Sequence, residues 1–573
     1  MSADYDFDLG TNTFPVTTRS ASAQVWFDRG LVWCYAFAHE EAVRCFRRAA
    51  EHDPDCAMAW WGVGYAAGPY YNKPWEKLDA IELEATLRTV RHAVRQAFDR
   101  IGNTVPVERA LIEALAHRYP SPESDDDFGR WNDAYANAMR EVYRSFPAHA
   151  DVCALYAEAL MNRTPWALWD LVTGEPAPGA DTLEVIEALE AAIAAREAAG
   201  EPDHPGLLHL YIHALEMSPT PERALRAADR LRELVPDAGH LRHMPTHIDI
   251  QCGDYQATVD WNVRAVAADR KLSALDEPPG VWHRLSFAHN YHFMLYGAMF
   301  LGHERAAMEA TRGILEVVSE SVLRVPSPPM ADWLEGFVAM QVHAPIRFGR
   351  WRKILAMPFP EDRDLYCVTN AMLHYARGLA HAVLEDVPAA RREQARFEAA
   401  AARVPVSRMV FNNTCTDILA IAAEMLHGEI TYRTGDHDTA FTHLRAAVRR
   451  SEALPYDEPW GWMQPPRHAL GALLLEQGRV EEAEAVYRAD LGFDDTVIRA
   501  CRHPENVWSL HGYHECLVRL GKRTETALVA PRLAFALART DVPIESSCRC
   551  RRAAPCQAAP DPKPDSHRPC HGR

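Results

Sequence analysis

The sequence contains no long hydrophobic run. No stretch approaches the roughly 20 apolar residues that a membrane-spanning helix needs. The first residues, MSADYDFDLG, are acidic, whereas a secretion signal is basic and then apolar. Basic residues are not in excess either, because the formal net charge of the 573 residues is −18, which argues against a general nucleic-acid binder. We therefore predict a cytoplasmic protein with neither a membrane nor a nucleic acid as its partner.

Short catalytic signatures are missing as well. The chain has no phosphate-binding GxxxxGK[ST] loop, no GxGxxG after a strand, no GxSxG elbow and no HExxH. Strand-like alternation of apolar and polar residues is scarce. The composition, 48% hydrophobic and 24% charged, still supplies enough apolar material for a large core. We therefore expect a chain built from helices, whose function depends on the placement of single residues.

What the chain does contain is a helical repeat. In residues 23–54, Trp26 marks a first helix, Phe46 marks a second, and Pro54 ends it. Trp60 restarts the pattern 34 residues after Trp26. Such self-similarity at a fixed period is typical of repeat architectures. Looser helix–turn–helix units follow, among them residues 428–448, 471–487 and 505–521.

This unit resembles the tetratricopeptide repeat (TPR), and Pro54 stands where that family places its closing proline. The phrases HEEAVRCFRRAAEHDPDCAMAWWG, GHLRHMPTHI and WMQPPRHALGALLLEQGR look like a little-studied bacterial group of TPR proteins. The resemblance covers roughly residues 20–540 and implies an all-α, right-handed superhelical solenoid whose first helices line a concave groove. It implies no activity, and most proteins of this repeat type are scaffolds for a protein or peptide partner.

We divide the chain into three parts on this basis. Residues 1–22 are an N-terminal extension, and residues 23–540 are the solenoid. Residues 541–573 form a tail rich in Pro and Arg that we predict to be disordered. Within this tail, Cys548 and Cys550 could bind a soft metal ion as thiolates or have no ligand role.

Two loops lengthen the spacing between repeats. One loop is residues 275–280, which contain Pro and acidic residues. The other is residues 455–466, which contain Pro, Trp and acidic residues. Because loops of this composition tend to be held in place, we predict ordered lids or rim contacts and not slack linkers.

Seven histidines and one carboxylate share a helical face in the centre of the chain, at about residues 205–300. Counted back from the next turn residue (Pro219, Gly253 or Gly302), they stand three, six, ten or thirteen positions away. These offsets fall on one face of a helix with 3.6 residues per turn. Packed helices lie about 8–10 Å apart, so side chains from neighbouring repeats can meet. The residues are His209, His213, Glu216, His240, His243, His247, His289 and His292.

This grouping predicts a metal site. A set rich in histidine and poor in carboxylates suits Zn, Cu or Fe and disfavours Mg or Ca. Four side chains are expected to converge on a common point, namely His209, His213, His243 and His247. The remaining histidines would be further ligands or outer groups that orient the ligands, namely His240, His289 and His292. Glu216 would complete the coordination shell or act as a general base toward a bound water.

Other interpretations stay open at this stage. A histidine-lined groove can bind an anionic peptide or small molecule without a metal, and single histidines are often half-buried polar groups. An aromatic group nearer the N-terminus could form a wall for a substrate or could pack around an insertion. This group, with a carboxylate of the same helical phase, consists of Trp61, Tyr65, Tyr70, Tyr71, Asn72 and Glu158.

The sequence thus predicts a TPR-fold protein with a histidine-rich, metal-binding groove. We interpret it as a metal-dependent enzyme, either an oxidoreductase or a hydrolase, that acts on a small molecule or peptide in the groove. The alternative is a non-enzymatic TPR scaffold that binds a protein or peptide partner there. No pattern indicates an oligomeric state.

Overall fold

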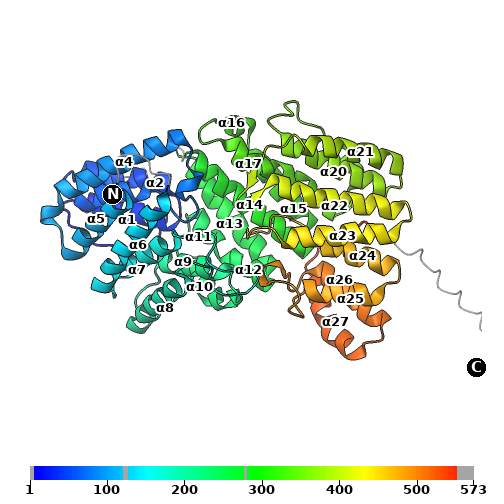
Figure 1. The fold of residues 1–573 in the computed structure, drawn as a ribbon. Helices are drawn as coiled ribbons and strands as arrows, with labels where there is room; N and C mark the ends of the chain where they lie inside the picture. The colour runs from blue at the N-terminus through cyan, green and yellow to red at the C-terminus, as the bar shows by residue number, and fades with distance from the viewer. Residues whose placement is uncertain (1–4, 121–126, 276–279, 552–573) are drawn as a thin grey trace, which may run out of the picture.

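The computed structural model describes residues 5–120, 127–275 and 280–551. In these ranges the chain is an all-α solenoid of TPR-like helix–turn–helix units, as predicted. Consecutive helices pack against each other as hairpins, for example α1 (Ala21–Tyr35) with α2 (His39–His52) and α20 (Cys367–Val383) with α21 (Val387–Ala401). Figure 1 shows the array running from the N-terminal helices at one end to the C-terminal helices at the other.

The N-terminal third consists of helices that pack against their neighbours in the chain, with longer connections after α3 and α7. Its remaining helices are α3 (Ala57–Ala66), α4 (Ala80–Asp99), α5 (Pro106–Arg118), α6 (Phe128–Ser145), α7 (Ala150–Met161) and α8 (Thr182–Ala199). The Phe46 ring of α2 explains the close packing here. A Cβ added at Gly30 or Gly62 would lie 2.8 or 2.3 Å from this ring, so only glycine fits at both positions.

The central helices carry the predicted histidine face. They are α9 (Pro205–Glu216), α10 (Leu225–Leu231), α11 (Gly239–His243), α12 (Pro245–Cys252), α13 (Tyr255–Ser273), α14 (Val281–Leu301) and α15 (Glu304–Val317). The segment GHLRHMPTHI differs from the single helix that the sequence suggests, because α11 ends before Pro245, which has no N–H to donate. Met244 keeps right-handed helical dihedrals (φ −53°, ψ −37°), so the histidines of α11 and α12 stay on one side.

The C-terminal half continues the array. Its helices are α16 (Glu320–Leu323), α17 (Met330–Ala339), α18 (His343–Arg347), α19 (Trp351–Ala356), α22 (Cys415–Arg433), α23 (His437–Glu452), α24 (Pro466–Glu476), α25 (Val480–Asp490), α26 (Val507–Arg519) and α27 (Arg523–Leu537). Two strands of two residues each, β1 (Met409–Val410) and β2 (Asn413–Thr414), form the one sheet in the described part of the chain. No helix of the described residues is long and apolar enough to cross a membrane.

The loop between α23 and α24 is ordered, as predicted for residues 455–466. Trp460, Trp462 and Met463 are buried in it. Most of the other predicted loop, residues 275–280, lies outside the described residues.

Part of the predicted tail, residues 541–551, packs against the solenoid. Ile544 and Ser547 are buried, and the Ser547 hydroxyl lies 2.6 Å from the Tyr487 hydroxyl. Cys548 and Cys550 form a disulfide, so neither offers a free thiolate to a metal ion. The composition argument failed for residues 541–551 because a few small and apolar side chains suffice to dock a short segment. Residues 552–573 lie outside the described residues.

A chain that ends at Thr540 is expected to be less stable than one that ends at Arg551. It loses the burial of Ile544, about 1.5–3 kcal/mol, and a buried hydrogen bond, about 0.5–1.5 kcal/mol. Comparison of the two truncated chains by thermal unfolding tests this. Equal stability of both chains would contradict the docking of residues 541–551.

Candidate metal centre

Helix α9 supplies the first part of the site. It begins at Pro205, and its N-cap residue His204 accepts a hydrogen bond from the Leu207 N–H through its ring. His209 and His213 stand four residues apart and therefore project from the same face. Both side chains are fully buried, at 0% exposure.

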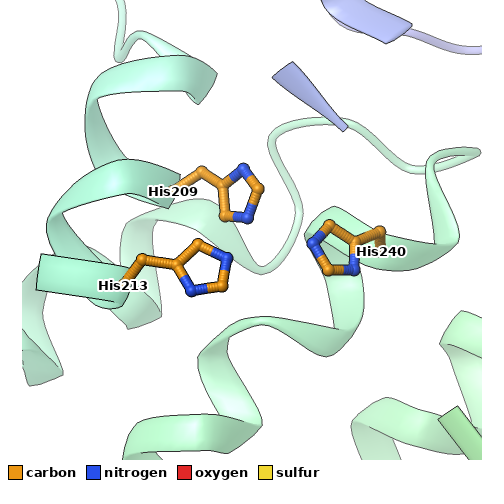
Figure 2. Close-up of side chains that lie close together, drawn as sticks. All are labelled: His209, His213 and His240. Carbon is orange, nitrogen blue, oxygen red and sulfur yellow. The ribbon is translucent and has the colours of Figure 1, made fainter. Parts of the chain in front are cut away.

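The third histidine comes from α11. His240 lies beside the other two, with ring centroids 4.9 Å from His209 and 6.3 Å from His213. One ring nitrogen from each of the three lies within 4.8 Å of the others, a spacing that could hold a metal ion. Figure 2 shows the three rings facing a common space between the two helices. We call this set, His209, His213 and His240, the first triad.

The two ring nitrogens of His209 and of His213 differ in their hydrogen-bond partners. His209 Nδ1 lies 2.6 Å from the Tyr35 carbonyl oxygen, and His213 Nδ1 lies 2.8 Å from Glu216 Oε1. A carbonyl only accepts, so Nδ1 of His209 carries the proton and its Nε2 keeps a lone pair. The Nε2 atoms of all three histidines are buried and have no hydrogen-bond partner. Outer acceptors on Nδ1 with free Nε2 atoms are what a histidine metal site requires.

Burial sets the protonation of the triad. Loss of water holds the pKa of His209, His213 and His240 well below the ordinary histidine value, and neighbouring histidines lower it further. The rings are therefore neutral near pH 7 and available as ligands. An all-nitrogen donor set of this kind fits Zn, Cu or Fe better than Mg or Ca.

Aromatic side chains enclose the first triad. The Phe37 ring lies 4.5 Å from His209 and 5.4 Å from His240, and Tyr71 lies 5.0 Å from His213. Phe37 has a positive φ of 53°, which is uncommon for a bulky residue and is found where the surroundings fix the backbone. The triad is thus shielded from bulk water on this side.

A cavity of about 170 Å³ adjoins the triad at His240. Phe37, Tyr70 and Trp282 give it apolar walls, and Lys73 is the one lysine or arginine in its lining. Its carboxylates outnumber that lysine, which already pairs with Glu82. The lining therefore disfavours a strongly anionic ligand. The carboxylates are Glu40, Glu41, Glu82 and Asp269.

Three further histidines form a second cluster. His243 of α11, His247 of α12 and His289 of α14 also bring one ring nitrogen each within 4.8 Å of the others. We call these residues the second triad. His292 belongs to neither group, because its Nε2 lies 2.9 Å from the sulfur of Met463. The four histidines predicted to converge on one point are divided between the two triads, and α11 contributes His240 to the first and His243 to the second.

Glu216 contacts the Nδ1 atoms of two histidine rings and not their Nε2 atoms. Its two oxygens face Nδ1 of His213 and Nδ1 of His247, at 2.8 and 2.6 Å. Glu458, from the loop before α24, also faces His247 Nδ1, at 2.9 Å. Burial raises the pKa of Glu216 and Glu458 to about 8 each. The roles of ligand and base predicted for Glu216 stay predictions, and the geometry favours an orienting one.

Glu216, His247 and Glu458 also meet the distance condition for a metal ion. Their close atoms, however, already satisfy one another as a histidine ring between two carboxyl groups. This group therefore leaves no donor atom in need of an ion, in contrast to the two triads.

The predicted aromatic wall is divided in the structure. Tyr70 lines the cavity and Tyr71 touches the first triad. Trp61 and Tyr65 stack on each other inside the N-terminal core, and Tyr65 donates to Glu158 at 2.6 Å. Trp61, Tyr65 and Glu158 do not line the cavity beside His240, and neither does Asn72.

Sequence reasoning missed several residues that shape the centre. The Tyr35 carbonyl lies at the end of α1 and Phe37 just after it, and Glu458 lies 211 residues after His247. Asn262 on α13 accepts from His243 Nδ1 at 2.8 Å. No spacing rule connects these positions to α9. The predicted order of the loop 455–466 was the one sequence feature that pointed to any of them.

No protein-family model matches the chain, and no curated protein matches it by sequence. Among solved structures, the human IFIT1 dimer with m7Gppp-AAAA is 9% identical, with a TM-score of 0.32 and coverage of 91% of this chain and 92% of that chain. Yeast Tom70 is 11% identical, with a TM-score of 0.27 and coverage of 90% and 99%. The Cut9–Hcn1 hetero-tetramer is 12% identical, with a TM-score of 0.29 and coverage of 87% and 78%. These scores are too low to bear on ligand or activity.

Proposed function

We propose that the chain is a metal-dependent enzyme that binds a transition-metal ion at the first triad and acts on a small molecule in the adjoining cavity. One observation carries the proposal. Three buried Nε2 atoms without any partner share one space. Leaving a buried polar atom unsatisfied costs about 1–3 kcal/mol, so three of them together favour a site that is completed by an ion.

The geometry supports catalysis at this position and not only structural binding. Three protein ligands leave an open coordination position, whereas structural sites are usually closed by four. A bound transition metal would supply Lewis-acid or redox chemistry there. Among the triad, His240 lines the cavity, so an ion held there would lie close to a place where a substrate fits. Phe37 and Tyr70 would hold the apolar part of that substrate.

A small molecule suits this cavity better than a peptide. The seven histidines are 0–9% exposed, so a peptide lying in an open groove would not reach them. The cavity volume of about 170 Å³ is likewise below the 300–1,000 Å³ of pockets for drug-sized ligands. A scaffold function on another surface of the solenoid is the alternative.

Metal analysis tests the proposal. Protein produced with Zn, Cu and Fe supplied should carry a transition-metal ion, and His240→Ala should weaken binding by more than the roughly 100-fold that loss of an outer partner costs. His427→Ala is the matched control, because this half-exposed histidine contacts only Glu398 and His443. Wild-type protein that holds no such metal would contradict the proposal.

Turnover is tested separately. Metal-loaded wild type and His240→Ala would each be incubated with a metabolite extract, and the compounds compared by mass spectrometry. A compound consumed only by the loaded wild type supports an enzyme. A protein partner captured equally by both forms, with no compound consumed, supports the scaffold alternative.

A further inference from the structure

The second triad, like the first, brings together three buried histidines, and α11 contributes one residue to each triad. His243 and His247 come from α11 and α12, and His289 comes from α14. His243 and His247 are 0% and 1% exposed, and His289 is 9% exposed. The Nε2 atoms of His243 and His247 lie only 2.8 Å apart. His289 also has a buried Nδ1 atom without a hydrogen-bond partner.

Hydrogen bonds fix where the protons are. The amide nitrogen of Asn262 donates to the Thr246 hydroxyl and to the Thr258 carbonyl, so its oxygen is the atom that faces His243. His243 Nδ1 must then carry the proton, and its Nε2 holds a lone pair directed at His247.

His247 is arranged in the same way from the opposite side. Its Nδ1 faces carboxyl oxygens of Glu216 and Glu458. Its Nε2 lies on the other side of the ring, beside His243 Nε2. An ion held by both rings would take the place of this direct contact, and His289 would add the third ring nitrogen.

We propose that His243, His247 and His289 form a second transition-metal site, and that Glu216 joins the two sites. Glu216 accepts from His213 of the first triad with Oε1 and faces His247 of the second with Oε2. One carboxylate therefore orients a ligand ring of each ion. The second site goes beyond the proposed function, because it does not require that the first triad binds metal or catalyses a reaction.

Glu216 and Glu458 are also the acidic groups beside the two proposed ions. In the described part of the chain, no ion pair links Glu216 or Glu458 to a lysine or arginine, and their partners are neutral or histidine side chains. Two divalent ions bound to neutral rings would place positive charge beside these buried carboxylates.

Zn²⁺ titration of the full-length protein, stripped of metal with a chelator, tests the second site by calorimetry. Wild type should bind two Zn²⁺ per chain. His240→Ala and His289→Ala should each bind one, and the double variant should bind none. Wild type with a single Zn²⁺ that is lost in His240→Ala and kept in His289→Ala overturns the second site and leaves the first. Wild type with a single Zn²⁺ that is lost in His289→Ala and kept in His240→Ala overturns the first site alone.

A separate measurement of Zn²⁺ affinity tests whether Glu216 positions one ligand of each ion. Glu216→Gln should weaken both Zn²⁺ ions about 10- to 100-fold, the usual cost of an outer partner, whereas Asn262→Ala should weaken only one. If Glu216→Gln weakens neither ion, the joining role is wrong. Should a variant fail to fold, anomalous X-ray scattering from Zn²⁺-soaked wild-type crystals decides the count. Two peaks, one beside each triad, support the proposal, and no peak beside His289 overturns it.

Discussion

Asp490→Ala is expected to lower the local free energy of unfolding in the C-terminal repeats by about 3–5 kcal/mol, because it removes the charged centre of a buried network. Asp490 is 0% exposed and accepts hydrogen bonds from His468, His503, Asn506 and Ser509. Burial alone would raise its pKa, but the neighbouring His468 and His503 hold it well below the usual range. The alanine variant leaves His468 Nε2, His503 Nδ1 and the Ser509 hydroxyl without this acceptor, while Asn506 keeps the His503 carbonyl.

Hydrogen exchange of the amides in α25 and α26 measures this effect, because local unfolding of a long array need not be two-state. Exchange should accelerate by roughly two orders of magnitude or more, as 1.4 kcal/mol corresponds to a factor of ten. Asp438→Ala is the control, since its side chain is 96% exposed and pairs only with Arg479. Exchange that is equally slow in wild type and Asp490→Ala would show that the network contributes nothing.

Removal of bound metal is expected to lower the free energy of unfolding by about 2.7–4.1 kcal/mol, if the free ion was present at 100 to 1,000 times its dissociation constant. The physical reason is that an ion held by buried neutral imidazoles binds the folded chain and not the unfolded one. Thermal unfolding with and without chelator measures the difference.

The control for metal removal is the His240→Ala, His289→Ala double variant. It has lost a ligand from each triad, so chelation should leave its unfolding temperature unchanged. If chelation destabilises the wild type and the double variant alike, the stabilising ion binds somewhere other than the two triads.

The fold could be predicted from the sequence because the contacts that define a repeat join residues close together in the chain. Trp26, Phe46 and Pro54 lie within one helical hairpin, and hairpins contact mainly their neighbours. The helical phase of the histidines was readable for the same reason. Helical phase gives the direction of a side chain but not its partner, so the division into two triads could not be derived. It depends on how α11, which carries both His240 and His243, lies relative to α9 and α14.

The outer parts of the site were not predictable, because they come from distant segments. Phe37 and Tyr35 precede the histidines by about 170 residues or more, and Glu458 follows them. The docking of residues 541–551 was missed for a related reason. Composition describes what a segment can bury by itself, whereas Ser547 is held by Tyr487 and His468, on helices already packed.

The contact between Glu458 and His247 has a consequence for the order of events during synthesis. At about 5–20 residues per second, roughly 10–50 s separate the appearance of Glu216 from that of Glu458 at the ribosome. Once α14 has been made, and until Glu458 appears, the α9–α14 region can fold while one side of His247 is still open to water. Newly made chains thus pass through a stage in which the histidines are accessible from the side that the loop 455–466 later closes. Loading with an ion would be fastest at that stage, and a finished chain would have to open this loop to exchange it.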